Sequence, residues 1–360
     1  MRSPLLQKRF DSVQCYPLPA AFLVLLYVLF LPGCASDLAD RHAVRQLPPL
    51  QLDGRQVTPD QASRDVTSPD LLAMDTAMHD FVQRYTAGTG PSQQKLVALH
   101  NAIRGQATLG LRYDPQAGGT AQEVFHRGTA NCLSYASLLV AMARDAGLEA
   151  RYQWLEVRPE WTREGERILV RLHVNALVKL KRGHHYMVDI DPLEPRDIAA
   201  SREISDKDAL ALHHSNLAME ALAVGDLEGA WLQGVRALQT SPGLPLLWVN
   251  LGVIYRVAGQ YRAAEDSYQY ALRLDQGERS AMNNLAVLYA IEGRSKERDH
   301  WEQRVARYRD ANPYYHAWLA QQAQEEGDWR LALRNYEKAL SLAPQDSRLL
   351  YDLGMTYSRM

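Results

Sequence analysis

The sequence predicts an α+β domain followed by an all-α array of helical repeats, and two observations lead to this prediction. Between residues 68 and 203, helical patterns of apolar residues are followed by strand patterns in which apolar and polar residues alternate. From about residue 211 onward, every segment is helical in pattern and one motif recurs at a constant interval. A chain of 360 residues has room for both parts and for a targeting segment.

The N-terminus resembles that of an exported protein. An apolar run at 20–31 follows three basic residues, and it is shorter than the roughly 20 apolar residues that a membrane span needs. A basic start and a short apolar core are typical of a secretory signal. The run ends in Leu-Pro-Gly-Cys34, which resembles a lipobox, where the cysteine is diacylated and becomes the mature N-terminus. We therefore expect a signal peptide at 1–33 and a lipidated Cys34, with an uncleaved membrane anchor as the alternative.

The resemblance to lipoproteins implies a place in the bacterial cell envelope. Ala35 and Ser36 follow the cysteine, as in lipoproteins that are sent on to the outer membrane. We therefore expect the periplasmic face of the outer membrane, with the inner membrane as the alternative. The formal net charge of −2 indicates no nucleic-acid partner. Prolines among polar residues predict a spacer at 34–67 that lifts the folded part off the membrane.

Cys132 is expected to be the only free thiol of the mature protein. The chain has three cysteines, of which signal cleavage removes Cys15 and lipidation consumes Cys34. A structural disulfide is thereby excluded. A solitary thiol in an exported protein is either an inert core residue or a reactive group.

The α+β domain is predicted at 68–203. Its expected elements are helices that begin at 68–70, cover 93–104 and begin at Cys132, and strands at 149–157, 167–180 and 185–191. A loop at 181–183 makes the last two strands a hairpin in which position 180 lies opposite 184. On that register His173 shares a face with two carboxylates, Asp189 and Asp191, and alternation alone does not choose between them.

The segment around Cys132 resembles the nucleophile helix of the transglutaminase-like superfamily. An aromatic residue and an alanine follow the cysteine, and Ala-Gly-Leu-Glu-Ala-Arg ends the segment. Leu-His173-Val-Asn resembles the family's histidine strand, and His-Tyr-Met-Val-Asp189 resembles its aspartate strand. The resemblance spans about 113–192. It implies a papain-like α+β fold with Cys132 as nucleophile, His173 as base and Asp189 as the orienting carboxylate, and Asp191 is the alternative for the third role.

This set of residues suits attack on an amide bond. The thiolate is the nucleophile, and we expect the helix N-terminus to stabilise that anion. An imidazole takes the proton and returns it to the leaving amine, while a carboxylate fixes the tautomer of the imidazole. These roles indicate a thioacyl intermediate, which either water or an amine resolves. No cluster of Cys, His and carboxylate residues completes a metal site, so we expect neither a metal nor a cofactor.

The C-terminal part, 204–360, repeats with a period of 34 residues. Leu217, Leu251 and Leu285 occupy equivalent positions (251 − 217 = 34 and 285 − 251 = 34). This period resembles that of tetratricopeptide repeats, and the resemblance implies a protein or peptide partner on the concave face of the array. The expected repeats are 211–244, 245–278, 279–312 and 313–346, with a partial repeat at 347–360.

Two other functions fit parts of the sequence. A non-catalytic envelope scaffold or assembly lipoprotein would act through the repeats, with a vestigial triad. A papain-like enzyme or a cell-wall amidase would share the order of cysteine and histidine. The aspartate on the strand after His173 favours the transglutaminase-like interpretation.

Overall fold

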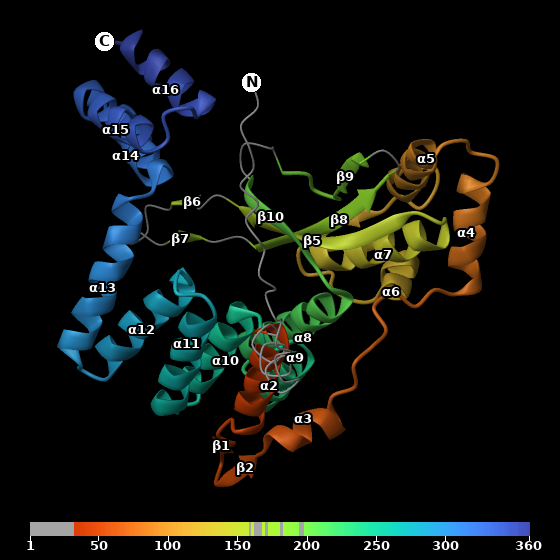
Figure 1. Ribbon diagram of the computed structural model, residues 1–360, viewed down its shortest axis with the longest axis horizontal. Helices are drawn as coiled ribbons and strands as arrows, with labels where there is room; N and C mark the ends of the chain where they lie inside the picture. The colour runs from red at the N-terminus through yellow and green to blue at the C-terminus, as the bar shows by residue number, and fades with distance from the viewer. Residues whose placement is uncertain (1–31, 158–159, 162–167, 170–171, 181–182, 194–197) are drawn as a thin grey trace, which may run out of the picture.

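The structure of the protein, a computed structural model, describes residues 32–157, 160–161, 168–169, 172–180, 183–193 and 198–360 (Figure 1). The predicted signal segment up to residue 31 and positions 181–182 of the predicted hairpin loop lie outside these residues. Within the described ranges, no helix is both long and apolar enough to cross a bilayer.

Four helices of the α+β domain precede its main sheet in the chain. They are α4 (Thr76–Thr86), α5 (Ser92–Arg104), α6 (Ala121–Arg127) and α7 (Cys132–Asp145). The first of them begins later than the predicted start at 68–70. The carboxylate of Asp70 accepts the backbone N–H of Leu72 (3.0 Å) and forms a turn. Asp75 caps α4 instead, because its carboxylate accepts the N–H of Met78 (3.0 Å).

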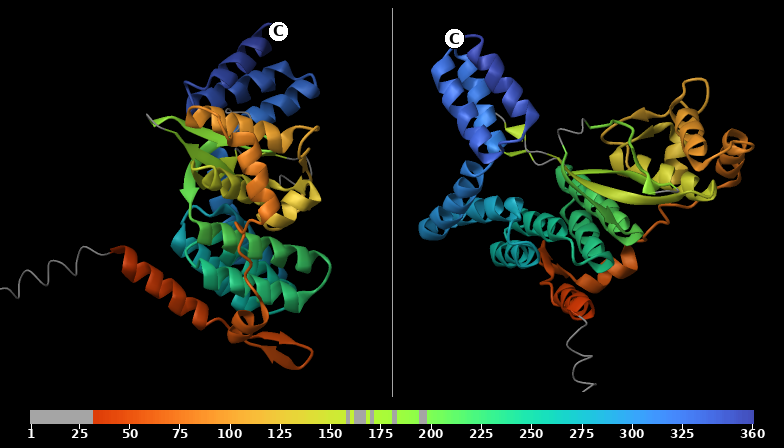
Figure 2. Two further views of the ribbon diagram at one scale, coloured as in Figure 1. Left: turned by 90° about the vertical axis from the view of Figure 1, so that its right-hand side faces the viewer. Right: turned by 45° about the horizontal axis from the view of Figure 1, so that its top comes forward.

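A four-stranded antiparallel sheet packs against α7 (Figures 1 and 2). Its strand order is β10 (Ile198–Ile204), β5 (Glu149–Val157), β8 (Leu172–Lys179) and β9 (His185–Val188). The hydroxyl of Tyr152 in β5 donates to Ser137 of α7 (2.9 Å), so both side chains are paired inside this core. Two short pairs of strands accompany the sheet: β3 (Arg112–Tyr113) with β4 (Thr129–Ala130), and β6 (Glu160–Trp161) with β7 (Ile168–Leu169).

The pairing of β8 with β9 has the predicted register. The N–H of Leu180 donates to the carbonyl of His184 (2.8 Å), and Ala176 pairs with Val188. The strand predicted at 167–180 is divided, however, into β7 and β8, and positions 170–171 lie outside the described residues. In β8 both faces are buried, since Asn175 and Leu177 are covered as well as their neighbours. Alternation predicts which side chains share a face but not whether a second layer covers it.

Residues 206–357 form four helical hairpins and a final helix. The helices are α8 (Asp206–Ala223) and α9 (Leu227–Thr240), α10 (Pro245–Val257) and α11 (Tyr261–Leu274), α12 (Arg279–Ile291) and α13 (Ser295–Asp310), α14 (Pro313–Glu325) and α15 (Trp329–Leu342), and α16 (Ser347–Tyr357). Gly225 ends the first helix with a φ of +83°, a conformation that favours glycine. Because β10 ends at Ile204 and Ser205 caps α8, the array begins directly after the sheet.

Side chains between neighbouring helices hold the repeats together. A Cβ atom on Gly252 of α10 would lie 2.5 Å from the ring of Tyr268 in α11, so the two helices approach as closely as a glycine allows. The buried carboxylate of Glu265 accepts hydrogen bonds from the Tyr289 hydroxyl (2.8 Å) and the Arg294 guanidinium (2.8 Å). Burial alone would raise the pKa of Glu265, but these two donors outweigh it and the pKa is lowered.

Residues 38–67 are folded, which corrects the prediction of a spacer at 34–67. The N-terminal elements are α2 (Pro32–Arg45), β1 (Leu50–Leu52), β2 (Arg55–Val57) and α3 (Pro59–Asp65). They lie against the first repeats, on the side away from the sheet (Figures 1 and 2). Leu50 and Val57 are fully buried, and the Gln239 side chain donates to the carbonyl of Pro59 (2.9 Å). A pattern search along the segment does not find this packing, because its hydrogen-bond partners in the repeats are 173 or more residues away.

Candidate active site

Cys132 is the first residue of α7, as predicted. Asn131 caps the helix, because its Oδ1 accepts the N–H of Ser134 (2.9 Å) while Oγ of Ser134 accepts the N–H of Asn131 (3.0 Å). The Ser134 hydroxyl also donates to the carbonyl of Ala117 (2.8 Å). These bonds fix the start of α7 and hold Cys132 where the unpaired backbone N–H groups of a helix gather.

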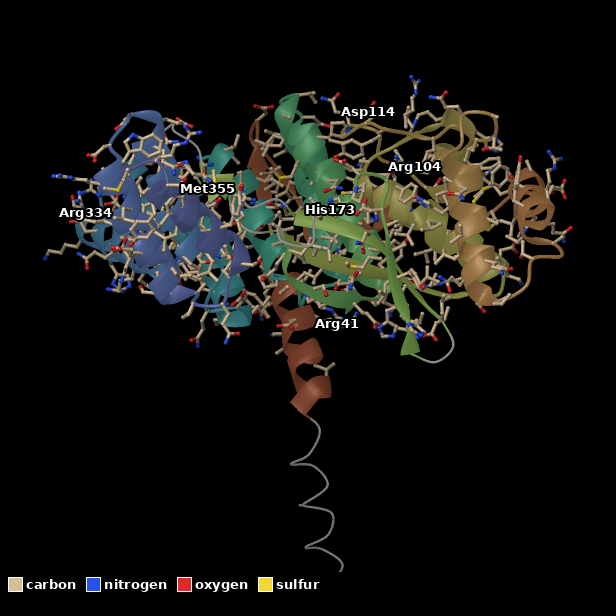
Figure 3. The ribbon with its side chains drawn as sticks, turned by 90° about the horizontal axis from the view of Figure 1, so that it is seen from above. Arg41, Arg104, Asp114, His173, Arg334 and Met355 are labelled. Carbon is tan, nitrogen blue, oxygen red and sulfur yellow. The ribbon has the colours of Figure 1, made fainter. Side chains whose placement is uncertain are left out.

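His173 on β8 and Asp189, directly after β9, form the second part of the site. The imidazole Nε2 and the carboxylate Oδ2 are hydrogen-bonded, and the two side chains are only 12% and 6% exposed. Because a carboxylate only accepts hydrogen bonds, Nε2 carries the hydrogen and Nδ1 is left to accept a proton. In Figure 3, His173 lies near the middle of the molecule, whereas Arg334 and Met355 mark the far end of the repeats.

The structure selects Asp189 from the two carboxylates that the sequence left open. Asp191 is exposed, and its backbone N–H donates to Oδ1 of Asp189 (3.2 Å). The Asp189 carboxylate therefore accepts bonds at both oxygens, one from His173 and one from the turn that follows β9. This second bond orients the carboxylate toward the imidazole.

Cys132 lies beside the start of β8, the end of the strand that carries His173. The backbone N–H of Val174, next to His173 in the strand, acts on the sulfur, and so does the charge of Asp189. Among the described residues, the sulfur and the imidazole are not hydrogen-bonded to each other. Such bonds are often long in empty active sites and tighten when substrate binds. The structure thus joins His173 to Asp189 and places Cys132 nearby, without a closed triad.

The Cys132 thiol is harder to ionise than an ordinary thiol. Burial raises its pKa, and the negative charge of Asp189 raises the pKa further. The backbone N–H groups of Val174, Leu133 and Cys132 itself lower the pKa but do not outweigh burial, although the residue as a whole is half-buried. The helix N-terminus thus stabilises the anion, as expected, but desolvation costs the anion more than the N–H groups contribute.

Both parts of the chain line the cleft beside Cys132, which has a volume of about 320 Å³. Trp154 and Val174 of the sheet form one wall. One face of α8 forms the opposite wall, with the spacing i, i+4, i+7 and i+8 of a single helical stripe. The residues on this stripe are Leu212, Asn216, Met219 and Glu220. The sequence pattern does not reveal this wall, because nothing in a repeat helix signals that its exposed face lies opposite a thiol.

Two further histidines, His126 and His214, form contacts within the protein. Nε2 of His126 lies 2.6 Å from the Asp75 carboxylate. Buried His214 donates through Nδ1 to Gln233 (2.8 Å) and accepts through Nε2 from the Ser68 hydroxyl (2.8 Å). Within the residues that the structure describes, no three His, Cys, Asp or Glu side chains lie close enough to hold a metal ion.

Two sequence families match the chain, one in the α+β domain and one in the helical array. The family described as the transglutaminase-like superfamily matches residues 79–190, which contain Cys132, His173 and Asp189. The tetratricopeptide repeat family matches residues 245–278, the second of the predicted repeats. The chain joins a transglutaminase-like domain to tetratricopeptide repeats. The prediction of this fusion is therefore confirmed, and the transglutaminase-like domain is the part that carries Cys132.

Solved structures similar to this chain include several repeat proteins. A crystal structure of MamA is 20% identical over 41% of this chain and 81% of its own, with a TM-score of 0.26. MamA from Desulfovibrio magneticus RS-1 is 17% identical over 41% of this chain and 84% of its own, with a TM-score of 0.27. YrrB, a TPR protein with an unusual peptide-binding site, is 21% identical over 41% of this chain and 77% of its own, with a TM-score of 0.26. No curated protein matches the chain.

Proposed function

We propose that this protein is a cysteine-dependent enzyme that acts on peptide or protein amide bonds through a thioacyl intermediate on Cys132. The observation that carries the proposal is the buried hydrogen bond between His173 and Asp189, beside a cysteine at the start of a helix. The bond sets the tautomer that leaves Nδ1 of the imidazole as a base. Removing such a pair from water is costly, which favours a chemical role for it over a structural one.

The proposed reaction moves one proton twice. Nδ1 of His173 takes the thiol proton while the sulfur of Cys132 attacks the amide carbonyl carbon, and a C–S bond forms. The charge moves to the carbonyl oxygen, to which the backbone N–H of Cys132 is suited to donate. The C–N bond then breaks, the imidazolium returns its proton to the leaving amine, and a thioester remains. Water or a second amine attacks the thioester, which yields an acid or a new amide and restores the thiol.

The repeats are proposed to hold a protein or peptide partner near this thiol. Tetratricopeptide repeats present extended surfaces that bind proteins and peptides. The α8 stripe already lines the Cys132 cleft, so a partner bound along the array lies close to the reacting sulfur.

We propose further that a signal peptide exports the enzyme and that lipidated Cys34 anchors it at the periplasmic face of the outer membrane. The lipobox-like sequence and the following Ala-Ser support this proposal. Mass spectrometry of protein from the membrane fraction should find a diacylated Cys34 at the N-terminus, and Cys34→Ala should release the protein from the membrane. An N-terminus that begins at Met1 in the membrane-bound protein would contradict it.

A non-catalytic envelope scaffold is the second candidate. The raised pKa of the Cys132 thiol favours it, because a thiol that stays protonated is a poor nucleophile. A scaffold would act through the repeats, and Cys132→Ala would leave its function unchanged.

Turnover of glutaminyl substrates separates the two candidates. The full chain, purified in detergent, is incubated with benzyloxycarbonyl-glutaminylglycine or with extended glutaminyl peptides, and ammonia release is measured with and without an added primary amine. The enzyme proposal predicts ammonia release that Cys132→Ala and His173→Ala abolish. Incorporation of the amine indicates acyl transfer, and its absence indicates hydrolysis. Cleavage of a backbone amide would release peptide fragments instead of ammonia, so the same incubations are analysed by mass spectrometry. Neither ammonia nor a Cys132-dependent fragment from any of these probes would refute the enzyme proposal.

A further inference from the structure

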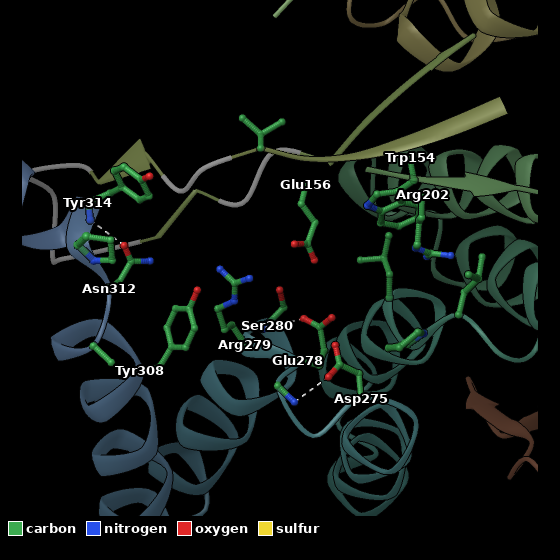
Figure 4. A pocket seen from close by; sticks show the side chains of 17 residues that line it. Trp154, Glu156, Arg202, Asp275, Glu278, Arg279, Ser280, Tyr308, Asn312 and Tyr314 are labelled. Atoms are coloured by element: carbon green, nitrogen blue, oxygen red, sulfur yellow. Dashed lines mark hydrogen bonds between the residues drawn. The ribbon is translucent and has the colours of Figure 1, made fainter. Parts of the chain in front are cut away.

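A groove of about 500 Å³ lies between the sheet and the edge of the repeat array. On the sheet side it is lined by Trp154 and Glu156 of β5 and by Arg202 of β10. Figure 4 shows Glu156 pointing from the sheet into the space that Arg279 and Ser280 enter from the opposite side. The groove is therefore formed where the two parts of the chain meet.

The repeat side of the groove is built from equivalent positions of three successive repeats. Positions 244–246, 278–280 and 312–314 all line it, and they are one period apart (278 − 244 = 34 and 312 − 278 = 34). These positions are the turns that connect one repeat to the next, at the starts of α10, α12 and α14. They form the edge of the array and not the concave face on which the sequence predicts a partner.

The groove adjoins the Cys132 cleft. Trp154 of the sheet and Leu246 of α10 line both spaces, so a ligand that lies across these two side chains reaches from the cleft into the groove. The two spaces, of about 500 and 320 Å³, each fall within the range of about 300–1,000 Å³ that is usual for ligand pockets. Their volumes leave room for a ligand larger than a single amino acid.

The lining of the groove suits a polypeptide better than a polyanion. Two arginines lie over aromatic rings, Arg202 over Trp154 (4.9 Å) and Arg279 over Tyr308 (4.5 Å). Carboxylates from both sides share the same space, among them Glu156 of the sheet. A surface with both charges and aromatic side chains can contact backbone, apolar and charged side chains at once, whereas nucleic acid requires a basic excess.

We propose that the acyl-donor polypeptide lies across Trp154 and Leu246, with its reactive amide at Cys132 and its flanking chain in this groove. The proposal rests on the proposed function and extends it, because it makes the turns between repeats part of the substrate site. The array then selects the sequence next to the reactive residue instead of only bringing a partner near. Short amides that fill the Cys132 cleft alone do not use the groove.

The test compares a narrowed groove with a matched control. Ser280→Trp places a large side chain at the start of α12, inside the groove, while Ser295→Trp makes the same change at the start of α13, which does not line it. The probes are benzyloxycarbonyl-glutaminylglycine and a library of extended peptides with a fixed central glutamine, from which the peptides that bind full-length Cys132→Ala are selected. Ser280→Trp should lower kcat/KM for the selected extended peptides about tenfold or more, equivalent to about 1.4 kcal/mol. It should leave kcat/KM for benzyloxycarbonyl-glutaminylglycine unchanged. Ser295→Trp should change neither.

A binding measurement separates this proposal from the proposed function. Fluorescence anisotropy of the selected peptides is followed on full-length Cys132→Ala, with and without Ser280→Trp, after thermal melting has shown that each variant is folded. Glu156→Lys serves as a second groove variant on the sheet side. Weaker binding in both groove variants supports the groove even if the wild type turns nothing over, in which case only the enzyme proposal fails. Equal binding and equal kcat/KM in the groove variants, or no peptide binding at all, would overturn the groove proposal.

Discussion

Replacing Asp189 by asparagine should have opposite effects on two properties of the site, the rate of amide turnover and the ease with which the Cys132 thiol ionises. In the wild type the Asp189 carboxylate accepts the Nε2 hydrogen of His173, and its charge also raises the pKa of the Cys132 thiol. An asparagine amide can donate to Nε2, which places the remaining hydrogen on Nδ1 and removes the base. We therefore expect Asp189→Asn to slow amide turnover while it makes the resting thiol easier to ionise.

The size of the catalytic loss follows from the burial of the pair. With only 12% and 6% of the two side chains exposed, water does not replace the lost bond. A hydrogen bond to a charged group contributes about 1.5–3 kcal/mol, which corresponds to roughly 10- to 150-fold in kcat. Reversal of the His173 tautomer lowers kcat further, and in triads of this kind the total loss in kcat reaches the order of 10⁴-fold.

The assay follows kcat for ammonia release and, separately, the pH dependence of alkylation by iodoacetamide. In Asp189→Asn, kcat should fall and the midpoint of Cys132 alkylation should move to lower pH, because one of the causes that raise the thiol pKa is gone. Asp191→Asn is the matched control, since its side chain is exposed and Asp189 is the carboxylate bonded to His173. An unchanged kcat in Asp189→Asn, or an equal loss in Asp191→Asn, would refute the assigned role.

Three further predictions concern stability, each measured as the free energy of unfolding by denaturant titration. Gly252→Ala should cost about 1–3 kcal/mol because its methyl group meets an aromatic ring, whereas Gly354→Ala, at the equivalent position with open space around it, should be neutral or slightly stabilising. Leu50→Ala should cost about 2–5 kcal/mol because the N-terminal segment is part of the core; no loss would restore the spacer interpretation. Glu265→Gln should cost about 1–3 kcal/mol at pH 7, where the partly exposed Arg294 loses a charged partner. Since the folded pKa of Glu265 is lowered, that cost should shrink as the pH falls from about 4.3, the unfolded value, through the folded pKa; a cost that persists at acid pH would contradict the ion pair.

Local patterns were sufficient to predict the repeats and the strand that carries His173. A period of 34 residues places each helix of the array, because every repeat contacts mainly its neighbours. The register of β8 and β9 follows from the position of their hairpin loop, and it brings His173 and Asp189 to the same end of the sheet. Both are short-range properties of the chain.

The remaining features depend on residues that are far apart in the sequence. Leu50 is buried because the repeats cover it, and Glu220 faces the Cys132 cleft because the array begins directly after the sheet. The pKa of the thiol is another such property. A helix N-terminus is visible in the sequence, but the burial that outweighs it depends on residues that the rest of the fold brings around the sulfur.

Trapping the acyl-enzyme tests the central claim most directly. The full chain is incubated with a selected glutaminyl peptide, quenched in acid and analysed by intact mass spectrometry with peptide mapping. The proposed mechanism predicts an acyl adduct on Cys132 that hydroxylamine removes and that is absent in His173→Ala. Turnover of the peptide without an adduct on Cys132, or an adduct that forms equally well in His173→Ala, would contradict it.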